Sequence, residues 1–307
     1  MRTLIVTVLV AFATLAPAQD RPQRDRPAPP LPAGFKAIRD VEYVPGGGSS
    51  RSLDLYLPEA KPDKPLPLIV WIHGGAWLGG NKDRPNGIAL LKEGFALASI
   101  NYRLSQEAIF PAQIEDCKAA IRFVRAKSAE YGIDPTRIGV FGSSAGGHLV
   151  ALLGVSADKK EWEVGENLNQ ASQVQAVCDW FGPTNLLTMG VQSGPDSRLD
   201  HDAPDSPESK LIGASVQTAP EKANAASPLT YITPDDAQIL ILHGDKDPVV
   251  PMQQSETFHA ALEKAGVKTK LHIVKGGGHG DGFQVPEVQQ LVREFFVATL
   301  KPAASSN

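Results

Sequence analysis

The chain has 307 residues, 42% of them hydrophobic, and a formal net charge of −4. This length suits one large α/β domain or two small ones and is ample for a sizeable core. The mildly acidic net charge is not typical of a protein that binds nucleic acid, and the sequence has no run of basic residues of the kind that binds a membrane surface. We therefore expect neither as a partner. The two cysteines, Cys117 and Cys178, match no metal-binding spacing. Both lie in apolar stretches, where we expect two buried free thiols rather than a disulfide.

The first 18 residues have the features of a secretory signal peptide. Arg2 supplies a positive charge, an apolar run from Leu4 to Leu15 follows, and Ala16-Pro17-Ala18 has the small-x-small pattern of a cleavage site. The apolar run is too short to span a bilayer comfortably. We therefore expect cleavage near Ala18 and export, to a periplasm or to the medium. An uncleaved anchor or a buried strand is the alternative.

Residues 19–33 are rich in Pro, Arg and Asp, including the run RPAPPLP at 26–32. Such a composition favours an extended, polyproline-like leader and cannot build a core. The folded domain is therefore expected to cover residues 34–301.

Hydrophobic patterning within that domain predicts strands that alternate with helices. Alternating apolar and polar residues at 35–43 and 51–57, with a Gly-rich turn between them, indicate an antiparallel pair. The run at 66–72 is apolar almost throughout, which is typical of a strand buried on both faces of a parallel sheet. Further strands are expected at 96–101, 137–141, 174–181, 238–243 and 270–274, and helices at 86–93, 114–131, 148–153, 252–264 and 285–300. The pattern predicts an α/β fold: a mostly parallel sheet with antiparallel first strands and helices on both faces.

Residues 183–227 break this alternation with clusters of Gly, Pro, Ser and Asp and little periodicity. A loop of that length is unusual inside a compact domain unless it has a function. We therefore expect a small, lid-like insertion over the carboxyl edge of the sheet, which is where substrates bind in such folds.

The motif Gly142-Ser143-Ser144-Ala145-Gly146 lies between the predicted strand at 137–141 and the predicted helix that begins near 148. Strand, G-x-S-x-G and helix together form the context of a nucleophile elbow, in which glycines allow a sharp turn and the central serine projects from the sheet edge. Ser144 is therefore the candidate nucleophile. The alternative is an ordinary loop in which Ser144 caps the helix.

A serine hydroxyl needs a base, and the base needs an acid that holds its tautomer. Of the seven histidines, His279 stands out because it lies among glycines at 276–280, after the last predicted strand and at the same edge as Ser144. Two aspartates follow the strand at 238–243. We expect Asp245 to form the turn and Asp247 to be the acid. The chain order Ser144, Asp247, His279 is a known order for such a triad.

The oxyanion that forms during acyl transfer needs hydrogen-bond donors. His73-Gly74-Gly75-Ala76-Trp77 directly follows the apolar strand at 66–72. The backbone amides of Gly74 and Gly75 can turn toward a substrate oxygen, and the amide of Ala145, next to the nucleophile, supplies another donor. Trp77 is a candidate substrate-binding residue, with a packed core tryptophan as the alternative.

With these residues the chain resembles the α/β-hydrolase superfamily from about residue 35 to residue 300. Within it, the chain is most similar to the bifunctional feruloyl and acetyl-xylan esterase type, near the hormone-sensitive-lipase-like esterases. Many relatives of the lipase-like branch carry a third glycine where this chain has Ala76, which favours the carbohydrate-esterase side. The matching segments are HGGAW at 73–77, NYRL at 101–104, GSSAGGH at 142–148, DWFGPT at 179–184, and Asp245-Lys246-Asp247 with Val250-Pro251.

The resemblance implies an α/β-hydrolase fold and a serine carboxylesterase that needs no cofactor or metal, with Ser144 as nucleophile, His279 as base and Asp247 as acid. The expected substrates are small esters or acetyl and feruloyl esters of plant polysaccharide. One alternative is a serine peptidase of the prolyl-oligopeptidase type, although the chain lacks room for the propeller domain of those enzymes. The other is a non-catalytic binding protein with a hydrolase fold, although such proteins commonly lose a triad member.

Overall fold

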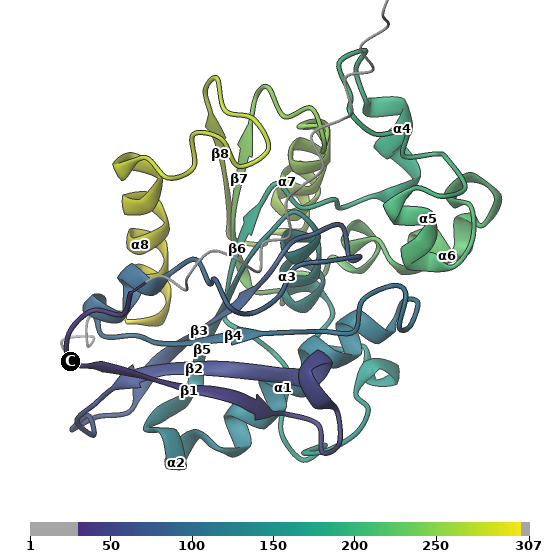
Figure 1. The fold of residues 1–307 in the computed structure, drawn as a ribbon. Coiled ribbons are helices and arrows are strands. Elements are labelled where there is room, and N and C mark those ends of the chain that lie inside the picture. The colour runs from purple at the N-terminus through teal and green to yellow at the C-terminus, as the bar shows by residue number, and fades with distance from the viewer. Residues whose placement is uncertain (1–29, 302–307) are drawn as a thin grey trace, which may run out of the picture.

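Eight strands form one sheet in the computed structural model, which describes residues 30–301 (Figure 1). The order across the sheet is β1-β2-β4-β3-β5-β6-β7-β8. β2 pairs antiparallel with β1 and with β4, and the other neighbouring pairs are parallel, which confirms the predicted sheet. The strands are β1 (Phe35–Glu42), β2 (Ser52–Pro58), β3 (Leu66–Ile72), β4 (Ala96–Ile100), β5 (Ile133–Ser143), β6 (Ala176–Trp180), β7 (Gln238–Gly244) and β8 (Thr269–Val274).

The predicted signal peptide at 1–18 and most of the predicted Pro-rich leader at 19–33 lie outside the described residues.

Side chains alternate between the two faces along each strand, so each face of the sheet has its own core. Along β3, Leu68, Val70 and Ile72 belong to one core, whereas Ile69 and Trp71 belong to the other. The first core is covered by α1 (Ala112–Ala126), α3 (Ala145–Val155) and α7 (Gln253–Ala265). The second is covered by the 3₁₀ turn η3 (Ile88–Glu93) and by α8 (Pro286–Leu300).

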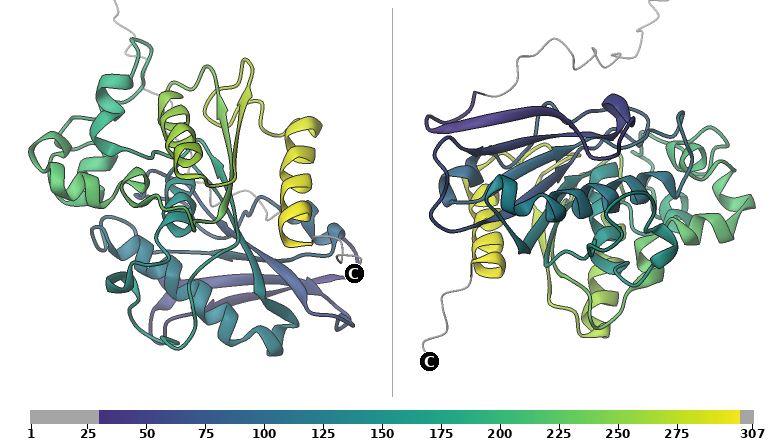
Figure 2. Two further views of the ribbon diagram at one scale, coloured as in Figure 1. Left: turned by 180° about the vertical axis from the view of Figure 1, so that it is seen from behind. Right: turned by 90° about the horizontal axis from the view of Figure 1, so that it is seen from below.

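Figures 1 and 2 show this arrangement, with α8 on one side of the sheet and α1, α3 and α7 on the other. The two cysteines are free and buried, as expected, Cys117 in α1 and Cys178 in β6. In the described part of the chain, no helix combines the length and the apolar character needed to cross a membrane.

Local structure differs from the sequence expectation in three places. The helix expected at 114–131 is divided at Lys127 into α1 and the single turn α2 (Ser128–Tyr131), which ends at Gly132 with a φ of 68°. The helix expected at 86–93 is the 3₁₀ turn η3. The insertion at 183–227 contains several short helical elements, which are η5 (Leu186–Thr188), α4 (Met189–Gln192), α5 (Pro207–Ile212), η6 (Val216–Thr218) and α6 (Pro220–Ala225). A further turn, η7 (Pro228–Tyr231), leads back to the sheet.

The strand order fixes where a site can form. β3 lies between β4 and β5. The chain therefore passes from β3 to its neighbour β4 on one side and then crosses back to β5 on the other side of β3. Such a reversal opens a crevice at the carboxyl ends of the strands. The loop after β3 and the turn after β5 therefore meet at this crevice, and they carry Gly74 and Ser144.

Candidate active site

Ser144 occupies the sharp turn between β5 and α3. Its φ of 55° and ψ of −122° are outside the regions that a serine ordinarily adopts, and such conformations cost on the order of 1–3 kcal/mol. The turn is held because the Ser144 N–H donates to Trp180 O on β6 at 2.9 Å and the Ser144 carbonyl accepts from His148 N at 2.9 Å. At Gly146 a β-carbon would lie 2.1 Å from Ile72 O, so only glycine allows α3 to pack this close to β3.

The structure brings together the three residues expected to form a triad, from the ends of three strands. His279, in the loop after β8, lies with Nε2 3.0 Å from Ser144 Oγ and with Nδ1 2.8 Å from Asp247 Oδ2. Asp247 follows β7. In this arrangement Nδ1 carries the proton that Asp247 accepts, which leaves Nε2 free to accept the proton of the serine.

The Asp247 carboxylate is fully buried but well provided with donors. Its Oδ1 accepts from the N–H groups of Val249 at 2.8 Å and Val250 at 3.0 Å, and its Oδ2 lies 3.4 Å from His243 Nε2. Burial alone would raise the pKa of Asp247, but the contacts with His243 and His279 and the backbone donors outweigh it and hold that pKa well below its usual range. Asp247 is therefore an anion suited to stabilise a protonated His279. Asp245 instead accepts from Gly276 N at 2.6 Å, the turn-forming role expected for it.

The glycine-rich loop after β3 lies against the elbow. A β-carbon on Gly74 would lie 2.7 Å from Ser143 O and 3.2 Å from Ser144 Cβ, so the loop backbone touches the turn that carries the serine. The next three residues have positive φ values, 110° at Gly75 and 56° at both Ala76 and Trp77. Within residues 30–301, none of the amides of Gly74, Gly75 and Ala145 has a hydrogen-bond acceptor. All three are thus free to donate to a substrate oxygen, as an oxyanion hole requires.

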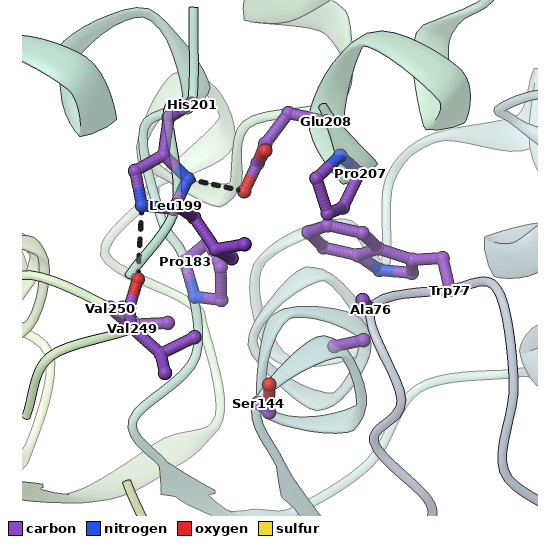
Figure 3. A pocket seen from close by; sticks show the side chains of 11 residues that line it. Ala76, Trp77, Ser144, Pro183, Leu199, His201, Pro207, Glu208, Val249 and Val250 are labelled. Atoms are coloured by element: carbon purple, nitrogen blue, oxygen red, sulfur yellow. Dashed lines mark hydrogen bonds and ion pairs between the residues drawn. The ribbon is translucent and has the colours of Figure 1, made fainter. Parts of the chain in front are cut away.

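The Trp77 side chain is buried in the core and also lines the pocket beside Ser144 (Figure 3). Its indole N–H donates to His148 Nδ1 at 3.1 Å, and His148 Nε2 donates to the carbonyl of Ala226 at 2.6 Å. Only the neutral Nε2–H tautomer of His148 satisfies both bonds, and burial lowers the pKa of His148 to about 4. One imidazole thus connects the glycine-rich loop to the end of the insertion.

The insertion forms the other wall of this pocket (Figure 3). His201 and Glu208 are buried there, and nothing in their sequence context singles them out. His201 Nδ1 lies 2.9 Å from Glu208 Oε1, and His201 Nε2 lies 3.0 Å from the carbonyl oxygen of Val249. The other residues that line the pocket are mainly apolar and include Trp77, Pro183, Leu199, Pro207, Val249 and Val250.

Backbone hydrogen bonds fasten the insertion to the rest of the domain. Arg198 N donates to Pro248 O at 2.8 Å, beside the turn that carries Asp247. Phe110 N donates to Leu211 O at 2.8 Å at the far side of the insertion. The pocket wall that holds Glu208 is therefore tied to the scaffold on two sides.

Three further residues near the triad had no role assigned from the sequence. The Phe181 ring packs on the His279 ring, with centroids 4.5 Å apart, and its φ of 45° is unusual for a phenylalanine. His243 contacts Asp247, as described above. Asp179 Oδ1 accepts from Gly182 N at 2.9 Å, which braces the loop after β6, and burial raises its pKa to about 7 against the opposing effects of that bond and of His243. The motif DWFGPT at 179–184 was the signal that could have led to Phe181.

Among residues 30–301, no group of three or more His, Cys, Asp or Glu side chains is placed to hold a metal ion.

Comparison with known protein families gives a match to the BD-FAE family model over residues 53–262. The chain belongs to the BD-FAE family. The matched range includes the glycine-rich loop, Ser144, the insertion and Asp247, and ends before His279. As a BD-FAE member the chain is an α/β-hydrolase of the esterase type, which agrees with the eight-stranded sheet and its antiparallel first strands.

Individual relatives agree with this assignment. The esterase LipQ of Mycobacterium tuberculosis is 36% identical over 249 residues, which cover 78% of this chain and 56% of LipQ. A truncated carbohydrate esterase from gut microbiota is 38% identical, with a TM-score of 0.78 and coverage of 85% of this chain and 95% of that one. An acetyl ester-xyloside bifunctional hydrolase from Caldicellulosiruptor lactoaceticus is 26% identical, with a TM-score of 0.66 and coverage of 80% and 88%. The chain spans less than two thirds of the length of the curated relatives that it matches.

Proposed function

We propose that this protein is an exported carboxylic ester hydrolase that works through a covalent acyl-enzyme. The observation that carries the proposal is the hydrogen-bonded path from Ser144 Oγ through His279 to Asp247, with distances of 3.0 and 2.8 Å. Activation of a serine hydroxyl requires a base within hydrogen-bond reach and a third group that orients the base. The names of the esterase relatives support the same reaction class.

In the proposed mechanism, His279 Nε2 takes the proton of Ser144 as Oγ bonds to the ester carbonyl carbon. The oxyanion accepts hydrogen bonds from Gly75 and Ala145, and Gly74 keeps the donor loop against the elbow. His279 then gives its proton to the departing alcohol oxygen, which leaves Ser144 acylated. Water loses a proton to the same imidazole as its oxygen bonds to the acyl carbon. The bond from that carbon to Ser144 Oγ then breaks, His279 returns the proton to Oγ, and the carboxylic acid is released.

We extend the proposal to acetyl or feruloyl esters of plant polysaccharide as the substrates. Two structural relatives support a carbohydrate ester, one being called a carbohydrate esterase and the other an acetyl ester-xyloside hydrolase. The signal peptide expected at 1–18 supports export, because such polymers occur outside cells. Trp77 would then form an aromatic wall of the pocket against the bound ester.

The test is hydrolysis of p-nitrophenyl acetate by the purified protein and by Ser144→Ala. We expect the variant to lose at least about 10³-fold in kcat, since removing a nucleophile in such a triad abolishes the covalent route. Ser143→Ala is the matched control, because it removes the neighbouring hydroxyl from the same turn and should keep the parental rate.

A fluorophosphonate probe gives an independent measurement, with one adduct expected on Ser144. A Ser144→Ala protein that matches the parental rate would refute the nucleophile. Equal hydrolysis of ester and amide substrates with the same acyl group would favour a peptidase over an esterase. A parent that neither hydrolyses esters nor takes up the probe would indicate a binding protein.

A further inference from the structure

Glu208 and His201 form a hydrogen-bonded pair in the wall of the pocket that also contains Ser144. Glu208 is only 2% exposed and His201 only 1%. Carboxylates are rarely buried to this degree unless all of their oxygens find partners. The pair is absent from the proposed mechanism, so its position requires a separate explanation.

His201 fixes the orientation of the Glu208 carboxylate. Both imidazole nitrogens of His201 face acceptors, Glu208 Oε1 at 2.9 Å and the Val249 carbonyl at 3.0 Å. A protonated imidazole donates to both at once, whereas a neutral imidazole has only one N–H. Burial lowers the pKa of His201, but the hydrogen bond and negative charge of Glu208 outweigh that effect and raise it. The Glu208 carboxylate is thereby held by one of its two oxygens.

The second oxygen, Glu208 Oε2, is buried and has no hydrogen-bond partner within the described residues. Glu208 lines the pocket, and Figure 3 shows it with His201 near the top of the pocket and Ser144 at the base. The walls between them are mainly apolar. A buried anionic oxygen without a donor is costly, and a donor that arrives with the ligand removes that cost.

We propose that Glu208 Oε2 accepts a hydrogen bond from a hydroxyl group of the substrate, and that His201 is the residue that positions it. This inference rests on the proposed esterase function and names the class of ester preferred, one that carries a free hydroxyl near the ester group. That hydroxyl belongs either to a polyol alcohol, such as an acetylated sugar, or to a phenolic acyl group, such as a ferulate. The two sources share the chemistry that Glu208 recognises.

The experiment measures the effect of removing one hydroxyl from the substrate. For the alcohol, kcat/KM is compared between monoacetates of methyl xyloside and analogues that lack one ring hydroxyl at a time. For the acyl group, methyl ferulate is compared with its analogue that lacks the phenolic hydroxyl. A hydroxyl that bonds to a charged, desolvated acceptor should favour the hydroxylated ester by about 10- to 100-fold in one of the two series.

The Glu208→Gln variant then tests whether Glu208 is responsible. Its amide oxygen can still accept from His201, while its NH₂ group replaces Oε2 and presents donors where the parent presents an acceptor. We expect the ratio between hydroxylated and deoxy esters to fall toward one in this variant. Glu221→Gln is the matched control, since Glu221 is exposed on α6 of the same insertion and its substitution should leave the ratio at the parental value.

Two results would overturn the inference while the esterase proposal stands. One is a parent protein whose kcat/KM is nearly the same for hydroxylated and deoxy esters in both series. The other is a folded Glu208→Gln protein in which the ratio of these two kcat/KM values is unchanged from the parent. If that variant does not fold, Glu208→Asp, which retracts the carboxylate by one methylene, is measured for the same ratio. Failure of the parent to hydrolyse p-nitrophenyl acetate would instead refute the esterase proposal itself.

Discussion

The two sides of the pocket are built in different ways. On the scaffold side, Ser144, Asp247 and His279 stand at the ends of parallel strands, so the sheet fixes their relative positions. On the insertion side, His201 and Glu208 belong to a segment of short helices and turns that no strand passes through. The scaffold side holds the groups of the proposed acyl transfer. The insertion side holds none of these groups.

The carboxylates on the two sides of the pocket also differ in their hydrogen-bond partners. Asp247 has a donor for each of its oxygens, which suits a charge that must be stable throughout a reaction cycle. Glu208 has a partner for one oxygen only. A carboxylate whose oxygens are both paired needs no further donor, whereas an unpaired oxygen beside a pocket can accept one from a ligand.

The largest effect is expected from the scaffold side, in Asp247→Asn. The amide would keep the shape of the side chain but remove the charge that stabilises protonated His279 and the preference for its Nδ1–H tautomer. We expect kcat/KM for p-nitrophenyl acetate to fall by about 10³- to 10⁴-fold.

The matched control for that variant is Asp245→Asn, two residues earlier, which can still accept from Gly276 N. It should stay within about threefold of the parent, because surface changes of this kind are close to neutral. Equal losses in the two variants would mean that the turn as a whole, and not the triad, was damaged.

The next largest effect is expected for Gly74→Ala, which separates the donor loop from the elbow. The added carbon would lie 2.7 Å from Ser143 O, so the loop must move away and carry the Gly75 amide with it. Misplacing one oxyanion donor typically lowers kcat by about 10²- to 10³-fold, and this can be measured with p-nitrophenyl acetate.

Gly79→Ala is the control in the same loop, because a β-carbon there meets nothing within 4 Å and Gly79 has no positive φ. We expect parental kcat for it. A Gly74→Ala enzyme with an unchanged kcat would show that the loop does not supply the donor.

His148 joins the two sides, and its effect should appear in stability as a function of pH. Burial lowers its pKa from the ordinary value of 6.5 to about 4 in the folded protein, so between these pH values the unfolded chain binds one proton more than the folded protein. The contribution of His148 to stability is therefore lost as the pH falls from about 6.5 to 4, by at most about 3 kcal/mol.

Urea unfolding of the parent and of His148→Gln at several pH values isolates this contribution, because the other groups cancel in the difference. The free energy of unfolding of the parent, relative to that of the variant, should increase as the pH rises from 4 to 6.5. A difference that does not vary with pH would contradict the buried neutral imidazole.

Most of the scaffold side could be predicted from the sequence because its signals are local. Apolar runs such as 66–72 mark buried strands, and glycines around Ser144 and His279 mark turns at strand ends. Once the strands are known to be parallel, those turns must lie at one edge. The sheet and the esterase family agree with the structure and the comparisons, whereas the roles of the site residues and the signal peptide remain predictions.

The side-chain pairings on the insertion side could not be predicted because they depend on contacts with residues far away in the sequence. His201 and Glu208 are seven residues apart in an aperiodic segment, and what aligns them is the carbonyl of Val249, far along the chain. His148 looks like an ordinary core histidine on α3 until Trp77 and Ala226 are seen on its two nitrogens. The break between α1 and α2 at Lys127 likewise does not interrupt the helical spacing of the apolar residues.

The bonds from Arg198 to Pro248, from Phe110 to Leu211 and from His148 to Ala226 have a consequence for the way the enzyme would meet its substrate. Lipases with a swinging lid become active when the lid opens at an oil–water interface. We expect a wall fastened to the scaffold at several points to stay in place when the ester binds. The velocity should therefore follow the concentration of dissolved ester and show no surge when a sparingly soluble ester begins to form droplets.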